Sequence, residues 1–121
     1  MNKIYLTGRI TKDIELKEYG DLKVVNNTIA VYGGKDKGNQ EITYFFDFKA
    51  FNYVANKLSS HAQKGEKIAI EGVLKQDKWD DNGQVKSKVV IYADNVEIIQ
   101  EFKQEKPEEQ PKETSQDNLP F

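Results

Sequence analysis

The sequence predicts an all-β domain with one short helix, followed by a disordered C-terminal tail. Runs of alternating apolar and polar residues recur through residues 1–100 and are separated by turns that contain glycine or asparagine. One stretch with helical spacing interrupts these runs near the middle of the chain. Beyond residue 102 the chain is polar and charged almost to its end, and such a segment buries too little apolar surface to offset the entropy of ordering it.

The first half of the chain predicts strands joined by turns. Ile4, Leu6, Gly8 and Ile10 alternate with Tyr5, Thr7 and Arg9, which is typical of a half-buried strand. Gly20-Asp21 indicates a hairpin that leads into a long strand. The strongest strand signal is that of residues 42–51, because this segment is rich in aromatic and β-branched residues. The expected ranges are a hairpin over 15–19 and 22–32, a flexible polar loop over 33–40 and a strand over 42–51.

The second half predicts the helix and the remaining strands. Val54 and Leu58 stand at helical spacing within residues 52–62, Asn52 is a candidate cap for the start, and Gly65 is expected to stop the helix. Asp81-Asn82-Gly83 predicts a tight hairpin turn. The strands expected here cover residues 67–75, 86–92 and 95–100.

This element order, β–β–β–α–β–β, matches the OB-fold, a five-stranded and partly open Greek-key barrel whose exposed face binds oligonucleotides in many proteins. We expect residues 1–101 to form this barrel and residues 102–116 to be a disordered linker. Residues 117–121 combine an acid with the apolar Leu119-Pro120-Phe121, and we expect this tip to bind partner proteins.

Composition narrows the class of protein. Residues 1–100 carry 15 Lys and Arg against 14 Asp and Glu, whereas residues 101–121 carry 3 against 6, so a nearly neutral domain is joined to an acidic tail. Cysteine is absent, which excludes disulfides and thiolate metal sites. Neither a membrane span nor a signal peptide is apparent, and we expect a soluble cytoplasmic protein.

Side chains along residues 45–51 separate into two faces. The set expected in the barrel core is Phe46, Phe48 and Ala50. The set expected to meet solvent or a partner is Phe45, Asp47, Lys49 and Phe51. Bases stack on aromatic side chains at about 1–3 kcal/mol each, and lysine neutralises phosphate. The alternative is that Phe45 and Phe51 cover the helix or a subunit interface.

Trp79 lies on the second predicted hairpin among lysines, a combination that suits a phosphate chain with exposed bases. The flanking lysines are Lys75, Lys78, Lys86 and Lys88. Tyr32 and the loop over 33–40 are further candidates for the same binding path. A tryptophan folded back on its own barrel is the alternative.

Few residues in the sequence are candidates for catalysis. His61, the only histidine, falls near the end of the predicted helix, where we expect a surface or capping residue. Asp77, Asp80 and Asp81 alternate in direction on the hairpin and lack a histidine partner, so we expect no metal site. No phosphate-binding glycine loop is present. The prediction is a protein that is not an enzyme and needs no cofactor.

Four motifs in order resemble the bacterial and bacteriophage single-stranded DNA-binding proteins, over essentially the whole chain. They are the opening strand at residues 2–10, the central block formed by Phe51 with the helix through Leu58 and residues 64–72, Lys78-Trp79 followed by a polar turn, and the tip at 117–121. The resemblance implies a homotetramer that protects single-stranded DNA during replication, recombination and repair. It departs at Phe45, where the family often has tryptophan, and at Asp47, where it is commonly basic.

Carried over by position, the resemblance also implies roles for individual residues. The stacking aromatics correspond to Phe45, Phe51 and Trp79, and the phosphate-contacting cations to Lys3, Lys64 and Lys78. Ile4, Leu6 and Gly8 lie on the strand that pairs subunits into dimers. The tip Asp117, Asn118, Leu119, Pro120 and Phe121 corresponds to the segment that recruits replication and repair proteins.

Other functions remain open from sequence. An OB-fold protein that binds RNA, or a primosome-like adaptor, is the main alternative. A metal-dependent nuclease of OB type is more remote, because the carboxylate, histidine and arginine constellation that it needs is missing. The location implied by the resemblance is the bacterial cytoplasm at the nucleoid, or a host cytoplasm if the source is a phage.

Overall fold

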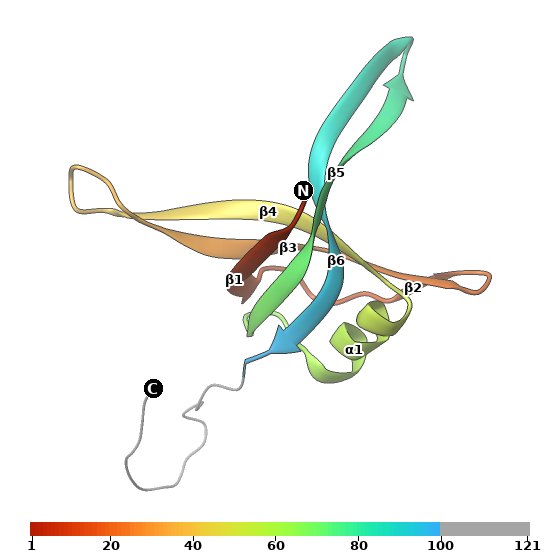
Figure 1. Ribbon diagram of the computed structural model, residues 1–121, viewed down its shortest axis with the longest axis horizontal. Helices are drawn as coiled ribbons and strands as arrows, with labels where there is room; N and C mark the ends of the chain where they lie inside the picture. The colour runs from red at the N-terminus through yellow and green to blue at the C-terminus, as the bar shows by residue number, and fades with distance from the viewer. Residues whose placement is uncertain (100–121) are drawn as a thin grey trace, which may run out of the picture.

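The computed structural model describes residues 1–99 and folds them into a β-barrel with one helix (Figure 1). The elements in chain order are β1 (Ile4–Ile10), β2 (Lys17–Tyr19), β3 (Leu22–Lys35), β4 (Glu41–Phe51), α1 (Tyr53–His61), β5 (Lys67–Asp81) and β6 (Gln84–Ile98). Within this described part, no helix has the length and apolar character required to cross a membrane.

Five strands close the barrel in the order β1-β5-β6-β4-β3, and β3 returns to β1. The closing contact is short, because β1 and β3 pair only at Arg9 with Ala30 and Ile10 with Ile29. β4 and β6 are parallel neighbours, and the other pairs are antiparallel. This arrangement confirms the predicted OB-fold barrel. The short β2 adds a sixth strand outside it, at the edge of β3.

The core lies inside the barrel and beneath α1. Inward side chains of the strands include Val25, Ile29 and Phe48, all almost completely buried. The helix covers one end of the barrel because Val54, Ala55 and Leu58 form its buried stripe. Isolated helices this short are marginal in water, so the burial of Leu58 against the strands is what holds α1 in place.

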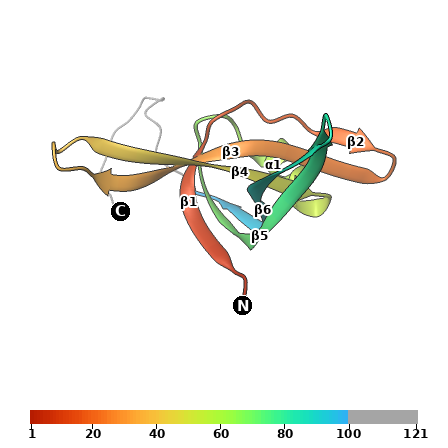
Figure 2. The same cartoon turned by 90° about the horizontal axis from the view of Figure 1, so that it is seen from above.

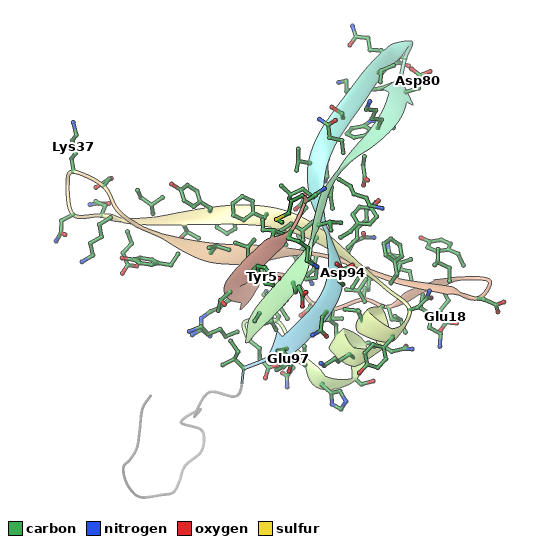
Figure 3. All side chains as sticks on the ribbon, viewed as in Figure 1. Tyr5, Glu18, Lys37, Asp80, Asp94 and Glu97 are labelled. Atoms are coloured by element: carbon green, nitrogen blue, oxygen red, sulfur yellow. The ribbon has the colours of Figure 1, made fainter. Side chains whose placement is uncertain are left out.

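Besides the hairpin of β2 with the start of β3, two longer hairpins extend beyond the barrel (Figures 1 and 2). We call residues 31–44 of β3 and β4 the β3–β4 arm, and residues 75–89 of β5 and β6 the β5–β6 arm. Figure 3 labels Lys37 at the tip of the first arm and Asp80 close to the tip of the second. Asn82 and Gly83 have φ of 53° and 84°, which gives the second arm the tight turn that the sequence predicts.

Several strand bounds differ from the sequence expectation, and β5 also runs to Asp81 rather than ending at residue 75. β2 begins at Lys17 rather than at residue 15, because Ile14 and Leu16 pack against the core. Residues 86–92 and 95–100 are not two strands, because β6 runs unbroken from Gln84 to Ile98. The irregularity lies instead in the pairing of β6 with β5, where the register shifts between Glu71 and Gly72. β3 also continues through Lys35 into the segment expected to be loop.

The helix start and one core position also differ. Asn52 does not cap α1, because its Oδ1 accepts a hydrogen bond of 3.0 Å from the Lys23 backbone N–H and its own backbone φ is 53°. The helix ends at His61, before Gly65. Phe46 is 39% exposed rather than in the core, because it lies beside the β3–β4 arm, where its ring is 6.3 Å from that of Tyr44 between centroids.

Candidate nucleic-acid interface

The strand register places the predicted aromatic residues of β3 and β4 on one side of the sheet. In β4, Phe45, Lys49 and Phe51 occupy alternate positions and therefore project together. Thr43 shares that side and pairs with Tyr32 of β3, and opposed residues of paired strands project in the same direction. Tyr32 is 62% exposed and Phe45 is 64% exposed. We call this side of the sheet the outer face.

The outer face continues across β6 to β5 and reaches Trp79. Lys49 of β4 pairs with Tyr92 of β6. Lys86 lies an even number of positions before Tyr92, projects to the same side and pairs with Trp79. Trp79 is 46% exposed. The aromatic residues predicted for stacking therefore lie on one continuous face, although they come from three different strands.

A groove of about 350 Å³ lies on the outer face between β4 and the β5–β6 arm. We call it the central groove. Its lining combines an aromatic ring with ammonium and carboxylate groups and includes Lys12, Asp47, Lys49, Asp77, Trp79 and Lys88. Such a lining offers a stacking surface together with groups that interact with phosphates or base edges.

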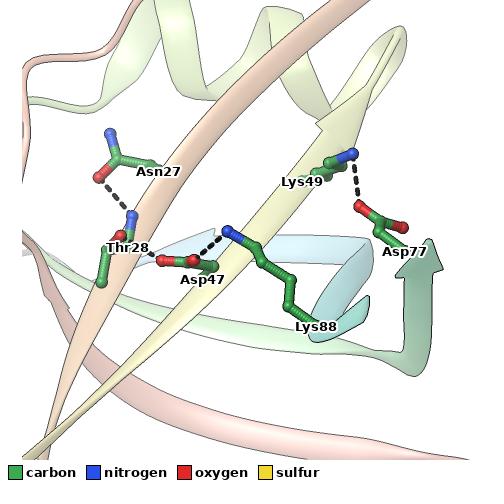
Figure 4. Close-up of polar contacts among 6 residues, drawn as sticks. All are labelled: Asn27, Thr28, Asp47, Lys49, Asp77 and Lys88. Atoms are coloured by element: carbon green, nitrogen blue, oxygen red, sulfur yellow. Dashed lines mark hydrogen bonds and ion pairs between the residues drawn. The ribbon is translucent and has the colours of Figure 1, made fainter. Parts of the chain in front are cut away.

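Two crossed ion pairs occupy the central groove (Figure 4). Lys49 Nζ lies 2.7 Å from Asp77 Oδ2, and Lys88 Nζ lies 2.6 Å from Asp47 Oδ2. Asp47 and Lys49 alternate along β4, whereas Asp77 and Lys88 oppose each other across β5 and β6. We call these four residues the Asp–Lys quartet. Its formal charge is zero, so the quartet adds little net attraction for phosphate.

Each carboxylate of the quartet is also held by a hydroxyl. Thr28 Oγ1 donates a hydrogen bond of 2.7 Å to Asp47 Oδ1, and the Tyr92 hydroxyl donates one of 2.8 Å to Asp77 Oδ1. The hydrogen bonds from Lys88 and Lys49, respectively, are the largest cause that lowers the pKa of the Asp47 and Asp77 carboxyls, and those from Thr28 and Tyr92 lower it further. Both carboxyls are therefore fully ionised at neutral pH.

Tyr92 is a component of the site that sequence reasoning missed. Its ring lies 5.5 Å from that of Phe51 between centroids, and Lys75 Nζ is 4.7 Å from its centroid. Lys49 Nζ is 5.8 Å from the same centroid. A cation over an aromatic face is electrostatically favourable. Alternation within β6 indicates that Tyr92 faces outward, but only the pairing of β6 with β4 brings it to Phe51.

The other lysines predicted to contact phosphate lie outside the central groove. Lys3 Nζ lies 3.2 Å from Glu71 and 3.6 Å from Asp94, and its hydrogen bond to Glu71 raises the pKa of the Lys3 ammonium. Lys64 is exposed in the turn between α1 and β5. Lys78 is exposed on the β5–β6 arm, but it alternates with Trp79 and so projects from the opposite side.

The remaining candidate residues are a histidine on the helix and the C-terminal tip. His61 is the last residue of α1 and is exposed. Among residues 1–99, no group of three or more His, Asp or Glu side chains is arranged to hold a metal ion. The predicted tip Asp117–Phe121 and the linker 102–116 lie outside the described residues.

Comparison with protein families gives a match over the described part of the chain. The model of the family described as "Single-strand binding protein family" matches residues 1–99. The chain is 35% identical over 103 residues to a single-stranded DNA-binding protein of Aquifex aeolicus, covering 82% of this chain and 70% of that protein. It is 32% identical over 102 residues to one of Treponema pallidum, covering 82% of this chain and 58% of that protein.

A solved structure shares the fold. It is a deletion variant of the single-stranded DNA binding protein from Thermus aquaticus, with a TM-score of 0.71 and 21% sequence identity. The match covers 83% of this chain and 51% of the Thermus chain. This chain therefore spans little more than half the length of some of the proteins that it matches.

Proposed function

This chain belongs to the single-strand binding protein family, and from that premise we propose that it binds and protects single-stranded DNA without sequence preference in replication, recombination and repair. The observation that carries the proposal is the outer face, on which Tyr32, Phe45 and Trp79 are each exposed by almost half or more. The proposed setting is the bacterial cytoplasm at the nucleoid, or a host cytoplasm for a phage protein, and the proposed role involves no catalysis.

In the proposed complex, successive bases stack on the aromatic residues of the outer face. Tyr32 and Phe45 provide the stacking surfaces on β3 and β4, and Trp79 provides the one on the β5–β6 arm. Phe51 is half-buried, with its ring tilted against that of Tyr92, so it offers less stacking surface than Tyr32 or Phe45. Every base has a π-face, so stacking at about 1–3 kcal/mol per base tolerates any sequence.

Phosphates are neutralised by lysines around the stacking residues. Lys49 lies within the central groove beside Phe51 and Tyr92. Lys3 and Lys64 lie elsewhere on the barrel, and Lys78 lies on the opposite side of the β5–β6 arm from Trp79. Their positions support a strand that curves around the molecule rather than one confined to the groove. Because each neutralised phosphate releases counterions, binding should weaken as the salt concentration rises.

The direct test is a titration of the full chain with oligo-dT at two salt concentrations, followed by tryptophan fluorescence. Trp79 is the only tryptophan, so the signal reports one position. We expect quenching on binding. Trp79→Ala lacks this signal, so its affinity is measured by the anisotropy of a fluorescently labelled oligo-dT, and it should weaken binding by about 1–3 kcal/mol. Tyr53→Ala is the matched control, because Tyr53 is an exposed aromatic on α1. Unchanged affinity of the Trp79 variant would remove this residue from the stacking set.

Competition between poly-U and poly-dT separates the proposal from the main alternative. Preferential binding of poly-dT by the protein supports a DNA-binding function. Equal or tighter binding of poly-U would favour RNA binding by the outer face, since stacking alone does not distinguish ribose from deoxyribose.

We also propose that the protein assembles as a homotetramer through β1. Within residues 1–99, Ile4–Gly8 pair with β5 on one side, and the pairing of β1 with β3 begins only at Arg9. An open strand edge of this kind is a template for pairing with a second copy. Mass measurement with and without long oligo-dT tests the subunit number, and a monomer under both conditions would contradict this assembly.

The tip Asp117–Phe121 is proposed to recruit replication and repair proteins. The support comes from the sequence alone. The apolar Leu119-Pro120-Phe121 follows a long polar and charged segment, so packing in the barrel core does not explain it. A 15-residue linker has a coil span of roughly 20 Å, so the tip would act on a short tether. Deleting residues 117–121 should abolish capture of such proteins, whereas deleting residues 104–108 should not. Equal capture by both variants would exclude the tip.

A further inference from the structure

Most of the positive charge in the central groove is already paired within the protein. Lys49 and Lys88 both donate to carboxylates of the Asp–Lys quartet. Lys12, which also lines the groove, makes no ion pair with any residue in the described range 1–99. A phosphate that enters the groove therefore meets one lysine that is in no ion pair, although its charge acts on the Asp47 carboxyl, and two lysines that each hold a carboxylate.

We infer that Asp47 and Asp77 are built-in competitors of the DNA phosphates for the ammonium groups of Lys88 and Lys49. In the free protein the two carboxylates hold these lysines, and a bound strand must either displace them or leave both lysines unused. This inference rests on the proposed function. It adds that the two carboxylates, and not only the aromatic residues and lysines, set the affinity and its salt dependence.

The geometry lets a bound strand reach both ion pairs. The side chains of Lys88 and Asp47 are 50% and 41% exposed, and those of Lys49 and Asp77 are 31% and 23% exposed. Neither pair is sealed inside the barrel, so phosphate oxygens can approach the ammonium groups from the groove. Because surface ion pairs are worth only about 0–1 kcal/mol, exchanging one carboxylate for a phosphate is energetically accessible.

The carboxylates themselves are held in place more firmly than the lysines. Asp47 accepts a second hydrogen bond from Thr28, and Asp77 accepts one from Tyr92, so each remains anchored when its lysine leaves. Lysine carries a flexible stem and a compact charge that can turn toward a phosphate. After such an exchange, a fixed and uncompensated carboxylate stays close to the DNA backbone and opposes binding.

Substitution of each aspartate by asparagine isolates this effect. Asp47→Asn and Asp77→Asn keep an amide oxygen that accepts the hydroxyl hydrogen bond, but they remove the negative charge. At low salt each variant should bind oligo-dT about two- to five-fold more tightly, as expected for release from an exposed ion pair. The slope of log affinity against log salt should steepen by up to about 0.7 for each lysine released.

Glu97→Gln is the matched control. Glu97 Oε2 lies 3.4 Å from Lys57 Nζ on α1, and neither residue lines the central groove. The variant makes the same change in net charge and also breaks one exposed ion pair. Its affinity and salt slope should stay at the wild-type values, which separates a local effect from a change in overall charge. Circular dichroism melts of all variants establish that each is folded.

A reciprocal variant gives an independent readout at the Asp47 pair. Lys88→Gln leaves Asp47 without its ammonium partner, so binding should weaken. Adding Asp47→Asn to Lys88→Gln removes the stranded carboxylate and should raise the affinity above that of the single lysine variant. Double-substitution cycles of this kind measure the coupling between residues in contact.

The outcomes separate the inference from the function on which it depends. If the wild-type protein does not bind oligo-dT, the proposed function fails. If it binds but both folded Asn variants bind no more tightly and keep the wild-type slope, the competitor role is wrong. The same conclusion follows if Glu97→Gln gains as much affinity, or if the double variant binds no more tightly than Lys88→Gln.

Discussion

Asn27 illustrates how one buried amide shapes the rim of the central groove. The side chain is 3% exposed, and its Oδ1 accepts hydrogen bonds from the backbone N–H groups of Lys12 and Thr28. Its Nδ2 donates to the Lys12 carbonyl at 3.0 Å. The segment after β1 is thereby fixed to β3, which places Lys12 beside the groove.

Asn27→Ala should lower the free energy of unfolding by about 1–3 kcal/mol, because it leaves partly buried backbone groups of Lys12 without partners. Asn26→Ala is the control, since Asn26 is exposed and has no side-chain hydrogen bond within the described residues. Urea unfolding at one fixed protein concentration measures both variants. Equal stability of the two would show that the Asn27 contacts contribute nothing.

At the scale of elements, closure of the barrel depends on how closely β1 approaches β3. A Cβ atom added at Gly8 would lie 2.3 Å from the Ala30 carbonyl oxygen and 2.8 Å from the Ile29 side chain. Both neighbours belong to β3, and one of them is backbone that cannot rotate away. Any side chain at this position must therefore push the two strands apart.

Gly8→Ala is expected to destabilise the protein by about 1–3 kcal/mol, the usual cost of overpacking. Gly38→Ala provides a comparison, because a Cβ there meets nothing closer than 3.5 Å. Thermal unfolding followed by circular dichroism should give a lower midpoint for the first variant and a nearly unchanged one for the second. A wild-type midpoint for Gly8→Ala would mean that the β1–β3 contact does not limit stability.

The two arms are the other element-scale feature with a functional consequence. β5 and β6 continue past the barrel, and this extension carries Trp79 away from the core. The turn at Asn82 and Gly83 keeps the two strands in register, so that Trp79 remains opposite Lys86 on the outer face.

At the scale of the whole molecule, the barrel carries almost no net charge. Residues 1–100 have one more basic than acidic side chain, and several lysines are engaged in ion pairs. A domain of this kind attracts DNA weakly from a distance. Its proposed affinity therefore depends more on stacking and on local charges in the groove than on a large electrostatic field.

The quartet also links stability of the molecule to pH. The pKa values of Asp47 and Asp77 are lowered on folding, so the folded state favours the ionised carboxyls. Their contribution to stability is present above the unfolded-state value near 3.8 and is lost as the pH falls through the lower folded-state values.

Comparison of the wild type with the double variant Asp47→Asn/Asp77→Asn should reveal this contribution. The difference in unfolding free energy should be largest near neutral pH and should shrink as the pH falls below 3.8 and through the lowered pKa values of the folded wild type. Urea titrations across this range measure it. A difference that stays constant with pH would mean that the ion pairs do not stabilise the fold.

Local patterns in the sequence determined a large part of this protein. Alternation along β4 separated Phe48 and Ala50 from Phe45, Lys49 and Phe51, because successive side chains in a strand point to opposite faces. The Asn-Gly pair specified a tight turn through its backbone preference. The order of the elements was sufficient to predict the barrel, and the four motifs were sufficient to predict the family.

Only the tertiary structure decided which side chains meet. The parallel pairing of β4 with β6 brings Lys88 to Asp47 and Tyr92 to Phe51, in both cases across more than forty positions of the chain. Alternation specifies the side of a strand on which a residue lies, but not which strand lies next to it. That neighbour is set by closure of the barrel and by register between distant segments, and for this reason the Asp–Lys quartet appears only in the folded molecule.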